Sequence, residues 1–565
     1  MTRASRFVYC CLLGGGVIAF TSMTGLGSPA RAQTLGSLVQ VTGPDPFSDC
    51  TADHVQSQQA AYGSVLYPNT PIEPWVAVDP TDASRLLAAH QQDRWDDGGS
   101  RGLVGVASTD GGSTWTNTIP QGVSQCTGGK FPRASDPWVT FAQDGTAFFF
   151  SLVLTPAQPT TPFGARMGGM LVSRSTDHAA TWETPVTLIQ NNSPHVLNDK
   201  NSITADPTAN GYVYAVWDQL SVSPATSSEG VGLLAGNDGV VIARKLLNST
   251  AGTSAVCEPF TKPPCKGGAP FFRFNFTGPT FFSMTADNGN TWTQAAPIYE
   301  PGVNKQTIDN IVQVLPNSNV LDFFTAINVT PAILNIGYIQ STNKGQSWSG
   351  PSFPTVLDIQ VVGVVTPDTQ QPVRDASILY SVATDPSSGN IYLAWQDYRF
   401  STATCTTSAG PIPVDGIAFS QSVDGGTTWS TPVMINQTPS NATNPCRQQA
   451  FIPAVVAAGN GTVVVTYYDF RNDTDTNGVE ATDYFAVFCS SKCSNAASWG
   501  NERRLTNASF NILNAPNAPG HFLGDYMGLA ASGTSNVFPV FGIATSPNVT
   551  AEFTRDIMLS GSASN

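Results

Sequence analysis

Charged side chains are scarce in this sequence of 565 residues. Asp, Glu, Lys and Arg together make up 12% of it, about half the share of an ordinary soluble domain, which is roughly 25%. Helical bundles and coiled coils need charged residues along their solvent faces, so the shortage argues against them. Basic residues are the scarcer sign. The chain has 26 Lys and Arg against 40 Asp and Glu, a net charge of −14, which disfavours a nucleic-acid partner.

Long apolar runs are missing after the first 32 residues. No later segment reaches the roughly 20 apolar residues that cross a bilayer. The N-terminus carries Arg3 and Arg6, an apolar stretch from Phe7 to Phe20, and the small-x-small sequence Ala30-Arg31-Ala32. That order is typical of a secretory signal peptide at residues 1–32, cleaved near Ala32. We therefore predict a secreted protein, extracellular or periplasmic, with no membrane span.

Cysteine is sparse but even in number. Of ten Cys, Cys10 and Cys11 lie in the signal segment, and an even remainder in an exported chain predicts disulfides. Proximity favours the pairs Cys257 with Cys265 and Cys489 with Cys493. No Cys or His cluster has the spacing of a zinc site, and no phosphate loop, nucleophile elbow or metalloprotease helix is present. We expect no metal and no cofactor.

What the chain does contain is a repeated octet. An apolar run leads into Ser or Thr, then a short polar turn, then Trp. Five copies begin at Ser108, Ser175, Thr285, Ser341 and Ser422, with a decayed sixth at residues 490–499. The Asp or Asn at the third position can accept backbone N–H groups across a hairpin tip, and Gly supplies positive φ. The octets are therefore expected to fold the chain rather than to carry chemistry.

This octet resembles the Asp-box, or BNR repeat, of the sialidase superfamily, whose members are β-propellers. The resemblance covers nearly the whole mature chain. It implies an all-β fold of four-stranded antiparallel blades with Asp-box turns. Inner-strand candidates begin near residues 73, 136, 199, 309, 375, 451 and 525, which favours seven blades. Six, the number in sialidases, is the alternative.

The mature chain, residues 33–565, is accordingly expected to form a single propeller. Inner strands recur at intervals of about 62 to 76 residues, except for one of about 110. The long interval indicates an insertion at residues 222–280 within the third blade. The last repeat has room for three strands, ending near residues 555–559. A strand near residues 38–41 would complete that blade, so that both termini close the ring.

The scarce charges concentrate in loops that share one face of a propeller of this kind. There we expect a polar funnel, in which arginines bind an anionic group, carboxylates do acid/base work, and Tyr and Trp stack on sugar rings. Asp96 or Asp97 is the candidate acid/base and Tyr526 the candidate nucleophile. Candidate substrate-binding residues are Glu73, Arg94, Arg133, Arg374, Arg399, Arg447, Arg471 and His521. No Asp-x-Asp-x-Asp-Gly calcium loop is identified.

The resemblance to sialidases can be followed through the first blade. Arg94 and Asp96 or Asp97 match the family's arginine and loop aspartate, whereas Ile72 or Glu73 stands where the family has its first arginine. A charged Glu there would repel a substrate carboxylate. The leading hypothesis is a sialidase-like glycoside hydrolase with a carbohydrate or glycoconjugate substrate. Two alternatives stay open: a non-catalytic propeller that binds glycan or protein, and a polysaccharide lyase that uses a His or Tyr with an Arg.

Overall fold

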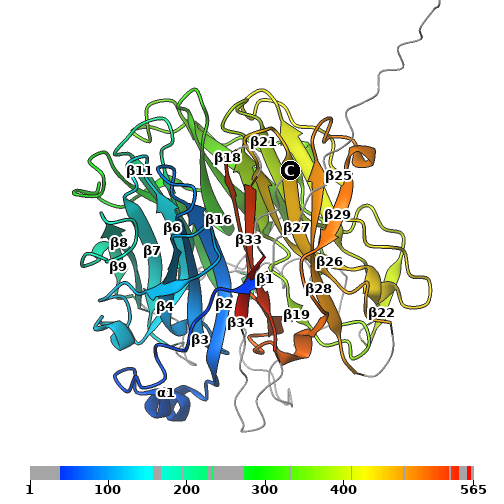
Figure 1. Ribbon diagram of the computed structural model, residues 1–565, viewed down its shortest axis with the longest axis horizontal. Coiled ribbons are helices and arrows are strands. Elements are labelled where there is room, and N and C mark those ends of the chain that lie inside the picture. Colours follow the sequence, from blue (N-terminus) through cyan, green and yellow to red (C-terminus); the bar gives the residue numbers. More distant parts are fainter. Residues whose placement is uncertain are drawn as a thin grey trace, which may run out of the picture.

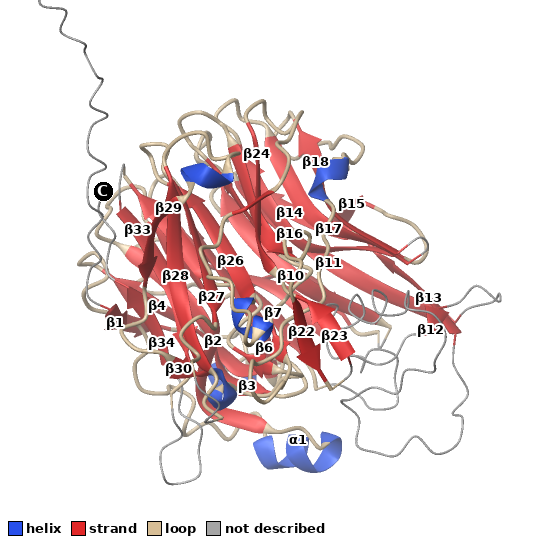
Figure 2. Ribbon diagram, turned by 90° about the vertical axis from the view of Figure 1, so that its right-hand side faces the viewer, coloured by secondary structure: helices blue, strands red, loops and turns tan. Residues whose placement is uncertain are grey.

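A computed structural model describes residues 38–156, 167–193, 195–224, 231–232, 273–329, 332–408, 410–474, 478–533, 536–545 and 556–560. The predicted signal peptide, the Cys257 and Cys265 pair and most of the predicted insertion at 222–280 lie outside these residues. Within them strands dominate (Figure 2), and α1 (Val55–Tyr62) is the one α-helix. The all-β prediction is confirmed. No helix among the described residues is long and apolar enough to cross a membrane.

Most strands pair antiparallel, in groups that each start from an inner strand. The inner strands are β2 (Leu66–Val78), β6 (Arg133–Phe141), β10 (Val196–Ala205), β16 (Lys305–Val314), β20 (Tyr380–Thr384), β26 (Ala450–Ala457) and β32 (Gly528–Ser532). Each pairs with a second strand: β3 (Leu86–Trp95), β7 (Ala147–Leu154), β11 (Val213–Pro224), β17 (Val320–Val329), β21 (Ile391–Asp397), β27 (Val463–Asp469) and β33 (Asn536–Ile543).

The third and outer strands complete the sheets. Third strands are β4 (Ser100–Ser108), β8 (Gly168–Ser175), β14 (Thr280–Thr285), β18 (Ala332–Ser341), β24 (Gly416–Ser422), β28 (Ala481–Cys489) and β34 (Asp556–Ser560). Outer strands are β5 (Thr116–Thr118), β9 (Val186–Asn191), β15 (Ala296–Tyr299), β25 (Val433–Met434), β29 (Gly500–Arg504) and β1 (Leu38–Gln40). Short additional strands are β12 (Val231–Gly232), β13 (Arg273–Gly278), β19 (Val373–Arg374), β22 (Thr404–Thr407), β23 (Gly410–Pro413), β30 (Phe510–Asn511) and β31 (His521–Phe522).

The inner strands contact one another in order around a ring. β2 contacts β6, β6 contacts β10, and the series continues through β16, β20, β26 and β32, which contacts β2 again. Within the described residues the ring thus passes through seven inner strands. The last sheet joins both ends of the chain, because β1 pairs antiparallel with β34, as Figure 1 shows. This arrangement leaves neither end of the ring as an open sheet edge.

The octets form tight turns at the end of the third strands. In the first, Asp110 Oδ1 accepts the backbone N–H of Thr114 at 2.9 Å, and Ser108 Oγ accepts that of Gly112 at 2.9 Å. The other four copies repeat both bonds. Three of their tryptophans pack edge-on against phenylalanines of the preceding blade: Trp292 against Phe148, Trp348 against Phe282 and Trp429 against Phe323. The octets therefore fix each hairpin and join neighbouring blades.

Bulges near the start of the inner strands bring charged side chains to the axis. The register against the second strand shifts at the same place in β2, β6, β10, β16 and β26. One residue in each bulge has a φ between 41° and 62°: Glu73, Asp136, Lys200, Asp309 and Ile452. Positive φ is uncommon outside glycine, and a bulge redirects a side chain. The repeated bulge is thus the local feature that positions the site.

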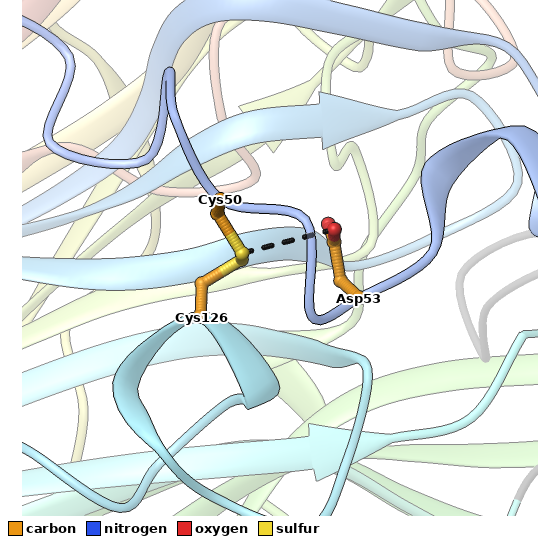
Figure 3. Close-up of side chains that lie close together, drawn as sticks. All are labelled: Cys50, Asp53 and Cys126. Atoms are coloured by element: carbon orange, nitrogen blue, oxygen red, sulfur yellow. Dashed lines mark hydrogen bonds between the residues drawn. A yellow bond between two sulfur atoms is a disulfide. The ribbon is translucent and has the colours of Figure 1, made fainter.

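Three disulfides are present in the described residues. They are Cys50–Cys126, Cys405–Cys446 and the predicted Cys489–Cys493. The first ties the N-terminal segment to the loop after β5, with Asp53 beside it (Figure 3). Disulfides persist in oxidising compartments rather than in the cytosol, so they fit an extracellular protein.

Candidate active site

Lys200 lies where the inner strands of four blades meet. Its Nζ is 2.5 Å from Asp525 Oδ2, 3.4 Å from Asp136 Oδ2 and 3.9 Å from Glu73 Oε1. All four residues are buried, and they come from the third, seventh, second and first inner-strand segments. Side chains from such distant parts of the sequence meet only at the centre of the ring. We call Glu73, Asp136, Lys200 and Asp525 the axial cluster.

Two cations hold the Asp525 carboxylate. Arg374 binds it with two parallel bonds, Nε to Oδ1 at 2.9 Å and Nη2 to Oδ2 at 2.5 Å, and Lys200 adds the contact described above. Burial by itself raises the pKa of Asp525, but the charges and hydrogen bonds of Arg374 and Lys200 outweigh it and hold that pKa far below its usual range. Asp525 is therefore ionised at neutral pH.

The pKa of Glu73 is displaced in the opposite direction from that of Asp525. Burial, together with the negative charge of Asp136, raises the pKa of Glu73 to about 8. Its Oε1 accepts the backbone N–H of Asp525 at 3.0 Å, and its Oε2 forms a hydrogen bond with the side-chain amide of Gln91. At neutral pH Glu73 is therefore mostly protonated and can donate a proton.

The two carboxyl groups are close enough to act on one bond. Because Lys200 Nζ lies 3.9 Å from Glu73 Oε1 and 2.5 Å from Asp525 Oδ2, these two oxygens are at most about 6.4 Å apart. Retaining glycosidases place their carboxyl groups about 5–5.5 Å apart, and inverting enzymes about 6.5–9.5 Å apart. Neighbouring carboxyl groups whose pKa values are displaced in opposite directions can serve as proton donor and anionic partner.

An aromatic group adjoins the axial cluster. The rings of Trp75 and Trp138 stack with centroids 3.4 Å apart, and Tyr526 meets them edge-on at 6.0 and 5.3 Å. The Tyr526 hydroxyl donates to the Pro137 carbonyl at 3.3 Å. Burial and the surrounding carboxylates, Asp136 first among them, raise the pKa of Tyr526 well above its usual value. The phenol is therefore protonated at neutral pH.

Two of the predicted anion-binding arginines meet at one ring. The guanidinium carbons of Arg94 and Arg374 lie 5.0 and 4.1 Å from the centroid of Phe522. Arg94 Nη1 also donates to Gln91 Oε1 at 3.0 Å, and the Gln91 amide in turn bonds Glu73. The structure thus brings together Glu73, Arg94, Arg374 and Tyr526 from the predicted set.

Two small hollows flank the axial cluster. The charged residues that line the first hollow are Arg94, Asp136, Asp199, Lys200 and Arg374. The other is lined by residues that include Trp75, Trp138, Asp309, Tyr380, Asp525 and Tyr526. Each has a cavity volume of about 20 Å³, room for about one water molecule. A sugar ring would therefore need side-chain movement to enter fully.

Asp96, Asp97 and Arg133 form a separate group beside Arg94. Arg133 Nη1 lies 2.5 Å from Asp97 Oδ1, and Asp97 Oδ2 accepts the Ser64 hydroxyl at 2.8 Å. Asp96 Oδ1 accepts the backbone N–H of Val65 at 2.8 Å. The contacts of these carboxylates thus hold the segment before β2 against the first two blades. The structure does not bring them into the axial cluster.

Each of the other three predicted arginines forms an ion pair with a carboxylate outside the axial cluster. Arg399 lies 2.7 Å from Asp397, Arg471 lies 2.6 Å from Asp469, and Arg447 lies 3.2 Å from Asp368. His521, half-buried, has Nδ1 3.2 Å from the carbonyl oxygen of Ala515. None of these contacts reaches the four residues of the axial cluster.

Lys200 and Asp525 belong to the axial cluster, but the sequence analysis does not predict them as site residues. Both occupy the position of the inner-strand repeat that Glu73 and Asp136 occupy, immediately before the strand becomes apolar. Aligning the inner-strand starts with one another, rather than with sialidases alone, would have found them.

Comparisons with known proteins give distant structural matches only. No protein-family model matches the chain, and no curated protein matches its sequence. A protein of unknown function from Dyadobacter fermentans has 14% identity and a TM-score of 0.42, covering 89% of this chain and 98% of that one. A Hadza microbial sialidase has 12% identity and a TM-score of 0.40, covering 85% and 76%. An α-L-arabinofuranosidase from Fusarium graminearum has 10% identity and a TM-score of 0.37, covering 76% and 92%.

Proposed function

We propose that the protein is a secreted glycoside hydrolase that acts on glycans at the mouth of the propeller axis. The pairing of Glu73 with Asp525 is the observation that carries this proposal. Glu73 donates its proton to the glycosidic oxygen as the bond to the anomeric carbon breaks, and the Asp525 carboxylate attacks that carbon. Water then hydrolyses the glycosyl intermediate, with Glu73 taking a proton back.

Tyr526 is the alternative nucleophile. It directly follows Asp525 in the chain, and its ring meets the stacked Trp75 and Trp138 edge-on. A phenol with a raised pKa attacks only if a neighbouring carboxylate takes its proton in the same step. The Tyr526→Phe variant distinguishes the two roles: it still forms a covalent glycosyl intermediate if Asp525 is the nucleophile, and forms none if Tyr526 is the nucleophile.

Arg94 and Arg374 favour an anionic glycan as substrate. Their guanidinium groups lie over one ring, that of Phe522, beside the proton donor, and guanidinium groups bind carboxylates and sulfates well. Glu73 replaces the first arginine of sialidases, but a protonated Glu73 carries no charge that repels a substrate carboxylate. Sialidase-like hydrolysis is therefore the specific form of the proposal.

A second candidate is glycan or protein binding without turnover. The observation in its favour is the volume of the hollows, about 20 Å³ each, which is too small for a sugar ring without rearrangement. In that case the arginines and aromatic side chains of the rim would recognise a ligand, and the axial cluster would hold the blades together.

A glycan panel tests these candidates against one another. The full chain is incubated with sialylated, uronic-acid, sulfated and neutral glycans, and both binding and products are followed. A hydrolase produces new reducing ends or free sialic acid. A lyase produces an unsaturated uronic acid, recognised by its new ultraviolet absorbance. Binding of a panel member with no product supports the second candidate and contradicts the first.

A further inference from the structure

A second group of carboxylates, two of them buried and the third partly buried, shares no residue with the axial cluster. Asp368 lies in the loop before β19, Asp473 follows β27, and Glu480 precedes β28. One oxygen from each lies within 4.8 Å of the others. These residues come from two neighbouring blades, so whatever binds them also joins the loops of those blades.

The charge of this group is not balanced by the described side chains. Arg447 is the one cation that forms an ion pair with it there, with Nη2 3.2 Å from Asp368 Oδ1 and Nε 3.6 Å from Asp473 Oδ2. Three carboxylates and one guanidinium leave a formal charge of −2. Asp473 is 2% exposed and Glu480 is fully buried, so water does not compensate that charge.

Asp473 is the side chain with unused binding capacity. Among the described residues, neither of its oxygens accepts a hydrogen bond, and the Arg447 Nε at 3.6 Å lies beyond hydrogen-bonding distance. A buried carboxylate without hydrogen bonds is costly unless a cation or a proton binds it. The Asp473 carboxylate faces Asp368 and Glu480.

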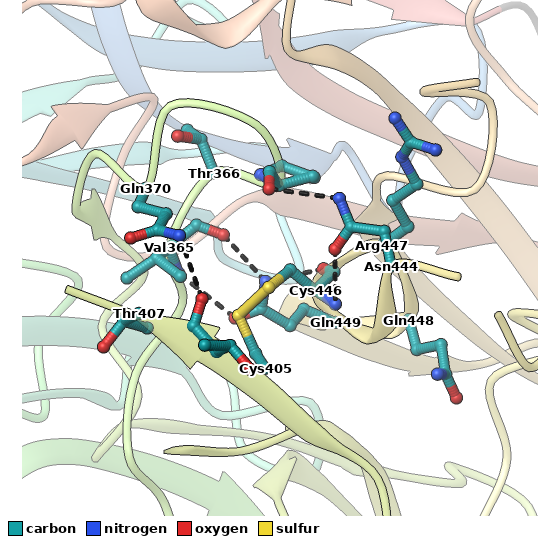
Figure 4. Close-up of a disulfide and its surroundings, with 12 residues drawn as sticks. Val365, Thr366, Gln370, Cys405, Thr407, Asn444, Cys446, Arg447, Gln448 and Gln449 are labelled. Atoms are coloured by element: carbon teal, nitrogen blue, oxygen red, sulfur yellow. Dashed lines mark hydrogen bonds between the residues drawn. A yellow bond between two sulfur atoms is a disulfide. The ribbon is translucent and has the colours of Figure 1, made fainter. Parts of the chain in front are cut away.

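The other two carboxylates are held in place. Glu480 Oε1 accepts the N–H and the hydroxyl of Thr369, each at 2.6 Å, and Oε2 accepts the N–H of Asp368 at 3.1 Å. Arg447 directly follows Cys446, which the disulfide to Cys405 anchors (Figure 4). Asn444 Nδ2 also donates to the Pro367 carbonyl at 3.1 Å. The oxygens are thus positioned before any ligand arrives.

We propose that Asp368, Asp473 and Glu480 bind a Ca²⁺ ion. Ca²⁺ prefers oxygen ligands, accepts several carboxylates and tolerates irregular geometry, whereas zinc and copper favour nitrogen or sulfur ligands. A divalent cation balances the formal charge of −2. The other described group with a metal-like composition, Cys50, Asp53 and Cys126, does not compete, because its two sulfurs form a disulfide.

The sequence around Asp473 gives independent support for a Ca²⁺ site. Residues 473–478 read Asp-Thr-Asp-Thr-Asn-Gly, the Asp-x-Asp-x-Asn-Gly spacing of a calcium loop. Asn477 stands at the fifth position, which takes either Asp or Asn in such loops. Asp475 and Asn477 lie outside the described residues, so the proposed site consists of Asp368, Asp473 and Glu480 alone. Glu480 comes only two residues after Gly478, so the loop is not an EF-hand.

A proton on Asp473 is the rival explanation. Burial and the negative charge of Asp368 raise the pKa of Asp473 to about 7. At about pH 8 that proton is largely lost, whereas a bound Ca²⁺ stays. Calcium dependence at that pH therefore separates the two explanations.

Calorimetry and thermal unfolding at about pH 8 test the proposal on the full secreted chain after treatment with EDTA. We expect wild type to bind Ca²⁺ and its Tm to rise with the Ca²⁺ concentration. Asp473→Asn should weaken binding at least about tenfold. The control Asp415→Asn removes a buried carboxyl with a similarly raised pKa, about 8, outside the cluster, and should bind as wild type does.

The apo state gives a second readout. Asp473→Asn relieves repulsion in EDTA, so its Tm should equal or exceed that of wild type there and fall below it in Ca²⁺. If Asp473→Asn does not fold, Glu480→Gln is measured by terbium luminescence in its place. The proposal is overturned if wild type shows neither Ca²⁺ binding nor a calcium-dependent Tm, or if the variants bind Ca²⁺ as tightly as wild type.

Discussion

Glu73 Oε1 accepts the backbone N–H of Asp525 at 3.0 Å, and this bond joins the first inner-strand segment to the last. The same contact places a carboxyl group with a raised pKa beside one whose pKa is lowered. One hydrogen bond therefore both contributes to closure of the ring and joins the two carboxyl residues of opposite acid/base character.

Loss of the Asp525 charge should destabilise the fold. Asp525→Asn leaves Arg374 and Lys200 buried without their shared counter-ion, which typically costs about 3–5 kcal/mol of unfolding free energy. Denaturant unfolding of the variant and of wild type measures this loss of free energy. Arg85→Ala removes an exposed ion pair with Asp82 and should cost less than about 1 kcal/mol. Equal costs for the two variants would contradict the account of the axial cluster.

The stability of the protein should depend on pH through Glu73. The pKa of Glu73 is raised to about 8 in the fold from an ordinary value of 4.5, so the folded state binds this proton more tightly. The resulting stability is fully present below pH 4.5 and is lost as pH rises through 8. Glu73→Gln does not titrate. The Tm of this variant, relative to the Tm of wild type, should therefore rise as the pH increases from about 5 to about 8. A constant difference across that range would argue against a protonated Glu73.

The octet turns should need a side-chain oxygen rather than a negative charge. Asn343 occupies the Asp position of the fourth octet, and its Oδ1 accepts the Ser347 N–H at 2.9 Å as Asp110 does for Thr114. Asp110→Asn should therefore keep the wild-type Tm at neutral pH, whereas Asp110→Ala should lower it. Thermal unfolding of both variants checks this, and a similar loss in both would show that the charge matters.

The Cys405–Cys446 disulfide should stabilise the rim that carries the carboxylate group. It closes a loop of 41 residues, and removing a native disulfide typically costs about 2–5 kcal/mol. The double Cys405→Ser, Cys446→Ser variant should unfold at a lower denaturant concentration. It should also bind Ca²⁺ more weakly, since Arg447 and Asn444 lose their anchor. Unchanged affinity would show that the loops are held without it.

Local patterns in the sequence predict much of the fold. The octets and the inner-strand starts are short-range features, so their turns and strands follow from spacing and residue type. Cys489 and Cys493 pair across a short loop for the same reason. The Cys50–Cys126 pair spans 76 residues, and nothing local indicates it.

The candidate site is less predictable, because it depends on which blades meet. Arg94, Arg374, Glu73 and Tyr526 are found from the sequence, but the sequence does not show that Lys200 lies among three carboxylates from other blades. Asp97 is predicted to be an acid or base because its position matches the loop aspartate of sialidases. Its partner Arg133 begins the next inner strand, 36 residues later in the chain, and the matching position does not reveal that contact.

Turnover by Glu73→Gln, compared with wild type and Asp322→Asn, tests the central claim most directly. Asp322 is also buried with a raised pKa, but it lines neither hollow. On the glycan that wild type cleaves, we predict that Glu73→Gln loses at least about a hundredfold in kcat while it still binds, and that Asp322→Asn retains its rate. Equal turnover in Glu73→Gln and wild type would contradict the assignment of the axial carboxyl pair.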